Sequence, residues 1–142
     1  MLRMLVRGAA GGALATVALT AVSLAGDQAG LMRDRPSGRV APGPPPRRAR
    51  RRAWPTETLA HFGFGVASGA AFCALSRGRA GLPLGIGYAL AAWVASQRGW
   101  VPRIGILPPD TRDDSSRTAV LATGHVVYGM VLVATVNHLT RP

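Results

Sequence analysis

Residues 59–75 read LAHFGFGVASGAAFCAL, an apolar, glycine-rich run that contains a single imidazole, at His61. The run lies inside an interval of 19 uncharged residues between Glu57 and Arg77. A hydrocarbon core about 30 Å thick needs about 20 residues of helix at about 1.5 Å each. The interval therefore predicts a helix long enough to cross a membrane.

Three further intervals of the chain are also apolar, uncharged and of similar length. All 17 basic and 6 acidic residues lie outside these four intervals. An unpaired charge at mid-membrane costs at least about 2.5 kcal/mol, so this exclusion favours lipid surroundings. The sequence predicts an all-α polytopic membrane protein. Its four transmembrane helices are expected at about residues 5–26, 57–77, 80–99 and 117–140.

A soluble helical bundle is the alternative to this interpretation. It would need a polar face on each helix at a period of about 3.6 residues. The polar residues in 12–26 (GALATVALTAVSLAG) and 119–136 (AVLATGHVVYGMVLVATV) are little more than threonines, one serine and one histidine. The absence of polar faces favours the membrane.

The arginines are distributed unequally between the two ends of the predicted helices. Eight lie within residues 27–56 and four within 98–117, whereas the opposite side holds five, at positions 3, 7, 77, 79 and 141. Cytoplasmic segments carry an excess of basic residues, so residues 27–56 and 98–117 are predicted to be cytoplasmic and both termini to lie outside. A competing interpretation treats the first helix as a signal peptide cleaved after Ala25, which would place the arginine-rich side outside and violate this bias.

The segment 27–55 is rich in arginine and proline and is predicted to be a disordered connection. Its end, RRARRRAW at 47–54, adjoins the second predicted helix. Arginines beside an anionic leaflet gain about 1 kcal/mol each, and tryptophan suits the headgroup boundary. We expect anionic lipid headgroups rather than nucleic acid as the partner, since no aromatic residues alternate with the basic ones. The expected lipid-surface residues are Arg47, Arg48, Arg50, Arg51, Arg52 and Trp54.

An internal repeat relates the second and fourth predicted helices. A shift of 64 residues aligns HFGFGVASGAAFCALSR (61–77) with HVVYGMVLVATVNHLTR (125–141), with five identities in 17 positions. The glycine pair of the first helix, Gly8 and Gly12, similarly echoes Gly81 and Gly85 of the third. The repeat predicts two helical hairpins in parallel arrangement, with the helix-packing glycines Gly65, Gly69, Gly129, Gly81 and Gly85.

The repeat places His61 and His125 at equivalent positions near the cytoplasmic ends of their helices. We expect two stripes to face each other, so that each glycine makes room for the partner helix and each imidazole points into the bundle. The stripes are His61, Gly65, Ser68 and Phe72, and His125, Tyr128, Gly129, Leu132 and Val136.

Three roles are open for this histidine pair. Each ring can bond a neighbouring backbone or hydroxyl group and fix helix packing. The pair can sense or relay protons, with Glu57 one turn from His61 to hold the charged form. A metal site from His61, His125 and Glu57 is the third role, but no fourth ligand is apparent, and no metal or other cofactor is predicted.

Signals for an enzyme are absent from the sequence. The single cysteine, Cys73, lies in the middle of a predicted helix, where it offers neither a disulfide nor a thiolate environment. No acid pair, nucleophile elbow or phosphate loop is present. We therefore expect no catalytic activity.

The third helix and the segment after it carry the most distinctive residues. They are Gly87-Tyr88, Ala92-Trp93, Ala95-Ser96, Gly99-Trp100, Pro102 and GILPP at 105–109, followed by His125 and Tyr128-Gly129. This pattern resembles the YagU-like inner-membrane proteins of bacteria, and the likeness extends over all four predicted helices. The resemblance implies a four-span inner-membrane protein, a link to acid tolerance in some relatives, and no established activity.

The sequence leaves two functions open and favours the first. One is a non-catalytic structural or partner-binding membrane component, as a homo-oligomer or within a larger membrane complex. The other is a transporter or pH-responsive permeation protein that uses His61 and His125. A dry, glycine-packed interior is expected for the first, and for the second a polar cavity lined by His61, Ser68, Tyr88, His125 and Tyr128.

Overall fold

The computed structural model describes residues 1–32, 47–77, 81–98 and 115–140, with only the backbone described at 47–57 and 97–98. The described residues form four helices: α1 (Leu2–Gln28), α2 (Arg47–Leu75), α3 (Leu82–Arg98) and α4 (Ser115–Thr140). No strand occurs within the described ranges. The prediction of an all-α, four-helix architecture is confirmed.

The helix bounds follow the uncharged intervals closely except at the start of α2. This helix begins at Arg47 rather than near residue 57, so the last part of the connection that we expected to be disordered is helical. Arginine and alanine are good helix formers, which explains why the helix extends into this basic segment. Residues 33–46 of the predicted connection lie outside the described residues.

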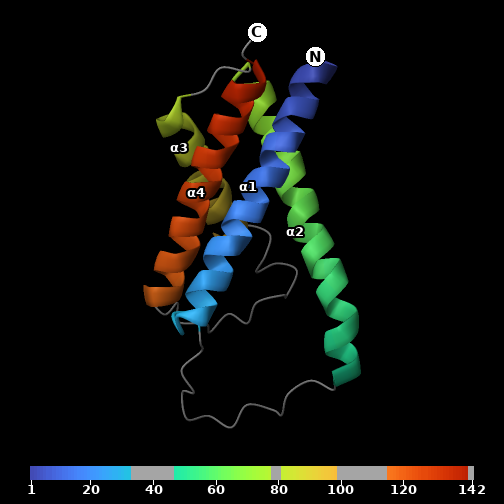
Figure 1. Cartoon of the computed structure of the whole chain (residues 1–142), viewed down its shortest axis with the longest axis vertical. Helices are drawn as coiled ribbons and strands as arrows, with labels where there is room; N and C mark the ends of the chain where they lie inside the picture. Colours follow the sequence, from blue (N-terminus) through green and yellow to red (C-terminus); the bar gives the residue numbers. More distant parts are fainter. Residues whose placement is uncertain (33–46, 78–80, 99–114, 141–142) are drawn as a thin grey trace.

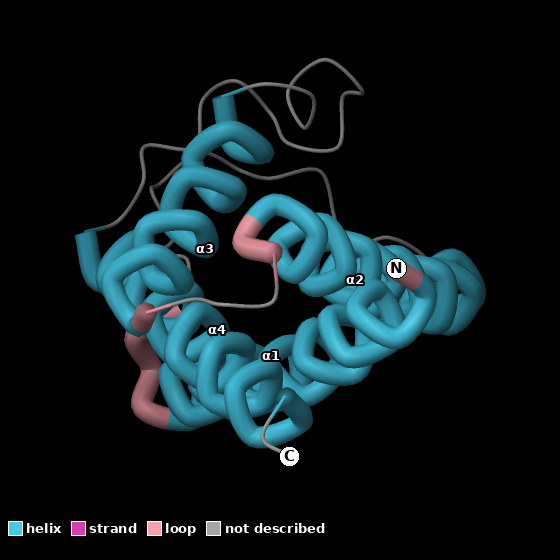
Figure 2. Tube along the Cα trace, turned by 90° about the horizontal axis from the view of Figure 1, so that it is seen from above, coloured by secondary structure: helices cyan, strands magenta, loops and turns pink. Residues whose placement is uncertain are grey.

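The four helices run alternately down and up, so the two termini lie at the same end of the bundle (Figure 1). α1 packs against both α2 and α4, and α3 packs against α4. Seen from above, α1 lies between α2 and α4 (Figure 2). The helices thus form two antiparallel hairpins, α1–α2 and α3–α4, that join along α1 and α4.

Within the first hairpin, α1 and α2 cross at four glycines. A Cβ atom placed on Gly8 would lie 2.5 Å from the carbonyl oxygen of Gly69, and one placed on Gly12 would lie 3.0 Å from the Cα of Gly69. A Cβ on Gly65 would collide with the Thr16 hydroxyl. Close approach of two backbones through small residues is the common packing mode of membrane helices.

The second hairpin repeats this crossing with one glycine from each helix. A Cβ on Gly85 would lie 2.8 Å from the carbonyl oxygen of Gly129, and a Cβ on Gly129 would lie 2.6 Å from that of Gly85. Gly85–Gly129 therefore corresponds to Gly12–Gly65, as the internal repeat predicts. Gly81 takes no part in the crossing, since it precedes α3, is exposed, and has only Pro83 within reach.

The core lies along the α1–α4 contact and extends toward α2. Its largest fully buried side chains are Phe72, Leu132, Val133, Val136, Thr16 and Cys73. Thr16 is the single buried polar side chain among the described residues, and its hydroxyl donates to the carbonyl of Gly12 at 2.8 Å. The polar group is thereby satisfied within its own helix, as an apolar interior requires.

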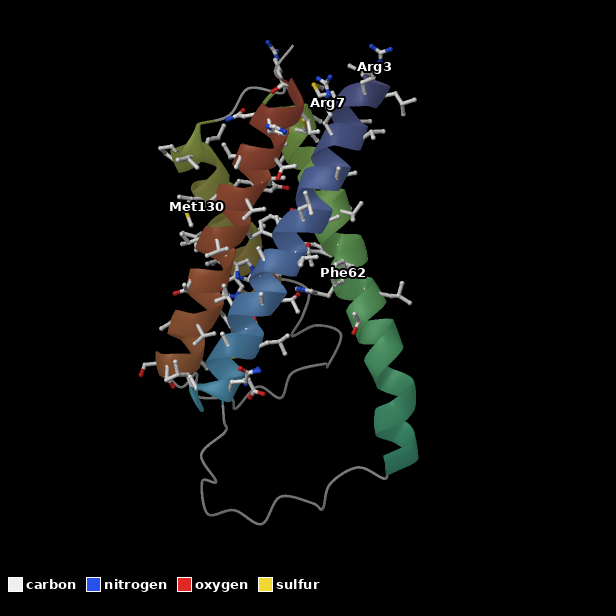
Figure 3. The ribbon with its side chains drawn as sticks, in the orientation of Figure 1. Arg3, Arg7, Phe62 and Met130 are labelled. Atoms are coloured by element: carbon white, nitrogen blue, oxygen red, sulfur yellow. The ribbon has the colours of Figure 1, made fainter. Side chains whose placement is uncertain are left out.

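The outer faces of the helices are apolar as well. Leu14 on α1 is 54% exposed, and Met130 on α4 points away from the bundle (Figure 3). α1, residues 58–75 of α2, and α4 are long and apolar enough to cross a membrane, whereas the apolar part of α3, Leu82–Ser96, is shorter. Arg3 and Arg7 lie at the end of α1 that carries the N-terminus (Figure 3), outside the apolar middle of the bundle. The fold thus has the surface expected of a protein solvated by lipid.

Candidate functional site

A cavity of about 40 Å³ lies between the helices and is lined by residues of all four. Most of its wall is apolar, and its polar lining includes His61 and Ser68 from α2, Ser96 from α3, and His125 and Tyr128 from α4. Trp93 adds an indole ring to the same wall. The structure therefore brings together four of the five residues that we expected in a polar cavity, His61, Ser68, His125 and Tyr128.

His125 is held on two sides. Its Nδ1 lies 2.7 Å from the carbonyl oxygen of Leu121, one turn earlier in α4. Its ring stacks on Trp93 of α3, with centroids 5.4 Å apart and planes 27° apart. A carbonyl oxygen can only accept, so Nδ1 carries the proton, and Nε2 of the neutral ring keeps a free lone pair.

His61 has a different environment on the other side of the cavity. The residue is exposed, and its ring meets the edge of Phe62 at a centroid distance of 6.5 Å. It makes no hydrogen bond to the residues that the structure describes. Both imidazoles line the same cavity.

Two tyrosines tie the neighbouring helices to α2. The hydroxyl of Tyr128 donates to the carbonyl of Gly65 at 2.9 Å, and the hydroxyl of Tyr88 donates to the carbonyl of Ser68, also at 2.9 Å. The Tyr88 ring packs on Phe72 at a centroid distance of 5.0 Å. These bonds occupy second lone pairs of helical carbonyls, so they join helices without breaking the helical ladder.

The expected facing of the two histidine stripes is only partly correct. Gly65 makes room for α1 rather than for α4, and Gly129 makes room for α3. α4 reaches α2 through the Tyr128 hydroxyl instead. The glycines therefore close each hairpin, whereas the histidines and Tyr128 line the space between the hairpins.

Several predicted residues lie where the structure describes no side chains. These are Glu57, Arg47, Arg48, Arg50, Arg51, Arg52 and Trp54. The proton-holding role of Glu57 and the lipid contacts of the arginines therefore stay predictions. In the part of the chain with described side chains, no three His, Cys, Asp or Glu side chains gather as metal ligands would.

The sequence interpretation missed three contributions to the cavity. Ser96 was named only as part of the pattern that resembles YagU-like proteins and was not predicted to line the cavity. Its hydroxyl donates to the carbonyl of Trp93 at 2.7 Å. Trp93 was also named only in that pattern and was not expected against His125, and Thr16 of α1 was not expected at all. The spacing of three residues between Trp93 and Ser96 is a signal that both lie on the same face of α3.

The fold and this cavity define a small α-helical bundle of the membrane-protein class. Comparisons with protein-family models, with curated proteins and with solved structures find no match to the chain. The resemblance to YagU-like proteins therefore stays a prediction, and the function is argued from the cavity itself.

Proposed function

We propose that this chain is a pH-responsive membrane protein in which His61 and His125 bind protons inside the cavity between the two hairpins. The observation that carries the proposal is that both imidazoles line one cavity together with the hydroxyls of Ser68, Ser96 and Tyr128. Imidazole is the side chain that ordinarily changes charge between pH 5 and 8. No catalytic step is part of the proposal.

Protonation of His125 has a defined place in this geometry. Nδ1–H already donates to Leu121, so the second proton binds at Nε2. The resulting cation is stacked on the Trp93 ring, an arrangement worth about 0.5–2 kcal/mol. The other titratable lining groups are His61 of α2 and Tyr128 of α4, while α1 and α3 contribute only neutral groups.

Charging both imidazoles would place two like charges across the cavity. In surroundings of low dielectric constant this repulsion acts more strongly than in water. The α3–α4 hairpin carries one charge and α2 the other. We expect acidification to push these elements apart and open the cavity.

The stacked tryptophan provides the test of this proposal. In a Trp54→Phe, Trp100→Phe background, Trp93 is the single fluorophore of its kind, and protonated imidazole quenches a stacked indole. In lipid nanodiscs we expect Trp93 emission to fall as pH decreases from 8 to 5, with a midpoint set by His125. His125→Asn should abolish this transition, and His138→Asn, exposed in the last turn of α4, should leave it unchanged. An emission that is flat with pH, or that titrates equally in His125→Asn, contradicts the proposal.

A structural or partner-binding membrane component is the second candidate function. It is supported by α3, which packs on α4 and leaves the apolar side chains of Leu82, Leu84 and Val94 exposed. Under this candidate, the chain extracted in mild detergent should co-purify with a defined larger complex. Recovery as a free monomer would argue against it.

Two further features belong to the proposal. The resemblance to YagU-like proteins supports placement in a bacterial inner membrane. The excess of arginines in 27–56 and 98–117 supports a cytoplasmic position for both segments. The basic start of α2 is proposed to contact anionic lipid headgroups, because each arginine near such a surface gains about 1 kcal/mol.

A further inference from the structure

The hydroxyl hydrogens around the cavity are all directed at protein acceptors. The Ser96 hydroxyl lies 2.7 Å from the carbonyl oxygen of Trp93, and the Tyr128 hydroxyl lies 2.9 Å from that of Gly65. Carbonyl oxygens only accept, so each hydroxyl is the donor and has no hydrogen left. What each hydroxyl offers the cavity is a lone pair.

The Ser68 hydroxyl follows the same rule through its pairing with Tyr88. Tyr88 donates its one hydrogen to the carbonyl of Ser68 at 2.9 Å. The two hydroxyl oxygens also lie 3.1 Å apart, and with the tyrosine hydrogen already engaged, Ser68 is the donor in that pair. With its hydrogen directed at a tyrosine hydroxyl, Ser68 also offers a lone pair.

His125 completes this set of acceptors. Its Nδ1–H is bonded to Leu121, which leaves Nε2 of the neutral ring as an acceptor. His61, which has no hydrogen bond to a described residue, retains one donor and one acceptor in its neutral form. The described polar lining therefore offers lone pairs at Thr16, whose hydroxyl donates to the carbonyl of Gly12, and at Ser68, Ser96, His125 and Tyr128.

The size and the aromatic wall of the cavity limit what can occupy it. A volume of 40 Å³ exceeds the roughly 10–15 Å³ that one water molecule needs, so it suits a molecule of one or a few heavy atoms. The negative face of the Trp93 ring adds attraction for positive charge. An anion would need several hydrogen-bond donors, and among the described lining residues only the His61 and Trp93 rings have one that is not already directed at a described acceptor.

We propose that the cavity binds a small cationic hydrogen-bond donor of the size of ammonium. Ammonium has N–H groups to donate to these acceptors and a positive charge that the face of an indole ring attracts. This inference rests on the proposed function, because His125 takes part in proton binding and in solute binding. It adds the class of solute that binds in the same cavity. Rings of oxygen acceptors bind small cations in membranes by the same physics.

The experiment uses the single-tryptophan full-length chain, with Trp93 as the fluorophore, in nanodiscs at pH 8, where imidazole is mostly neutral. Ammonium chloride is titrated at constant ionic strength against three comparison salts: sodium chloride, sodium formate and tetramethylammonium chloride. We expect a saturable change in Trp93 emission with ammonium alone. Tetramethylammonium carries the same charge without an N–H group, so it separates donation from charge.

Removing one acceptor supplies the residue-level test. Ser96→Ala should weaken ammonium binding about tenfold, the usual effect of one hydrogen bond to a charged group. Thr123→Ala is the matched control, because the Thr123 hydroxyl donates to the carbonyl of Ala119 at 2.8 Å on an exposed face of α4. This control should bind ammonium as the parent chain does.

Three outcomes would overturn the inference. These are no saturable change with ammonium, an equal change with tetramethylammonium or formate, and equal losses in Ser96→Ala and Thr123→Ala. If Trp93 emission titrates with pH through His125 but ignores ammonium, the inference fails and the proposed function stands. If ammonium saturates the signal but pH does not change it, the proposed function fails alone.

Discussion

The glycines of the two hairpins differ from those of the outer faces in what surrounds them. A Cβ on Gly12 would lie 3.0 Å from the Cα of Gly69, and one on Gly129 would lie 2.7 Å from the Cα of Ile86. Gly63 and Gly87 have nothing within 4 Å of such a Cβ. The same residue type thus has a packing role at two positions and none at the other two.

We predict that Gly12→Ala and Gly129→Ala each destabilise the chain by about 1–3 kcal/mol, because overpacking forces the backbones apart. Gly63→Ala and Gly87→Ala should be neutral or stabilising by up to about 1 kcal/mol, since alanine favours the helix. Unfolding in mixed micelles, followed by circular dichroism, measures both. Equal effects at all four positions would show that the glycine crossings do not hold the hairpins.

At the residue scale, the sequence predicted that two histidines would share a polar space but not how each would be held. The repeat of 64 residues and the 3.6-residue period were enough to predict that His61 and His125 line a common space, although His61 is exposed there. The stacking of His125 on Trp93 depends on how α3 is rotated relative to α4. The residue pattern of one helix does not determine this rotation. The same limit explains why Gly65 was assigned to α4 although it packs on α1.

At the element scale, the absence of charged residues predicted the positions of the helices well. It predicted the ends of the helices less well. The uncharged intervals located all four helices because a charge inside lipid is costly. The start of α2 was missed, since a run of arginines is unfavourable in lipid but favourable in a helix. The charge pattern indicates which residues can lie in the hydrocarbon core, whereas α2 extends beyond those residues into the basic segment.

The short length of α3 raises the question of whether this helix crosses the membrane, and this question can be tested through the topology of the chain. α3 has 17 residues, about 25 Å at about 1.5 Å per residue, against a hydrocarbon core of about 30 Å. If α3 crosses the membrane with the other helices, positions 3 and 138 lie on one side and position 28 on the other, as the alternating helix directions in Figure 1 require.

Single cysteines in a Cys73→Ala background test this arrangement. Cys73 is itself fully buried, so its removal leaves the surface unchanged. We expect Arg3→Cys and His138→Cys to react with a membrane-impermeant maleimide from one face of sealed vesicles, and Gln28→Cys from the opposite face. Labelling of positions 3 and 138 from opposite faces would mean that the chain crosses an odd number of times.

At the scale of the whole molecule, the two hairpins share one crossing geometry, and the cavity that contains the histidines lies between them. Gly12–Gly65 and Gly85–Gly129 are equivalent contacts, and the histidines that line the cavity are equivalent residues of the repeat. The apolar outer faces, with Leu14 and Leu24 more than half exposed, would be unfavourable in water but suit lipid. All of the proposals above require that lipid surrounds these helices.

Alkaline carbonate extraction of membranes, followed by detergent, tests this requirement most directly. We expect the full-length chain to stay in the membrane pellet under carbonate and to enter solution only with detergent. Recovery of the chain in the aqueous supernatant, monodisperse and without detergent, would contradict the account.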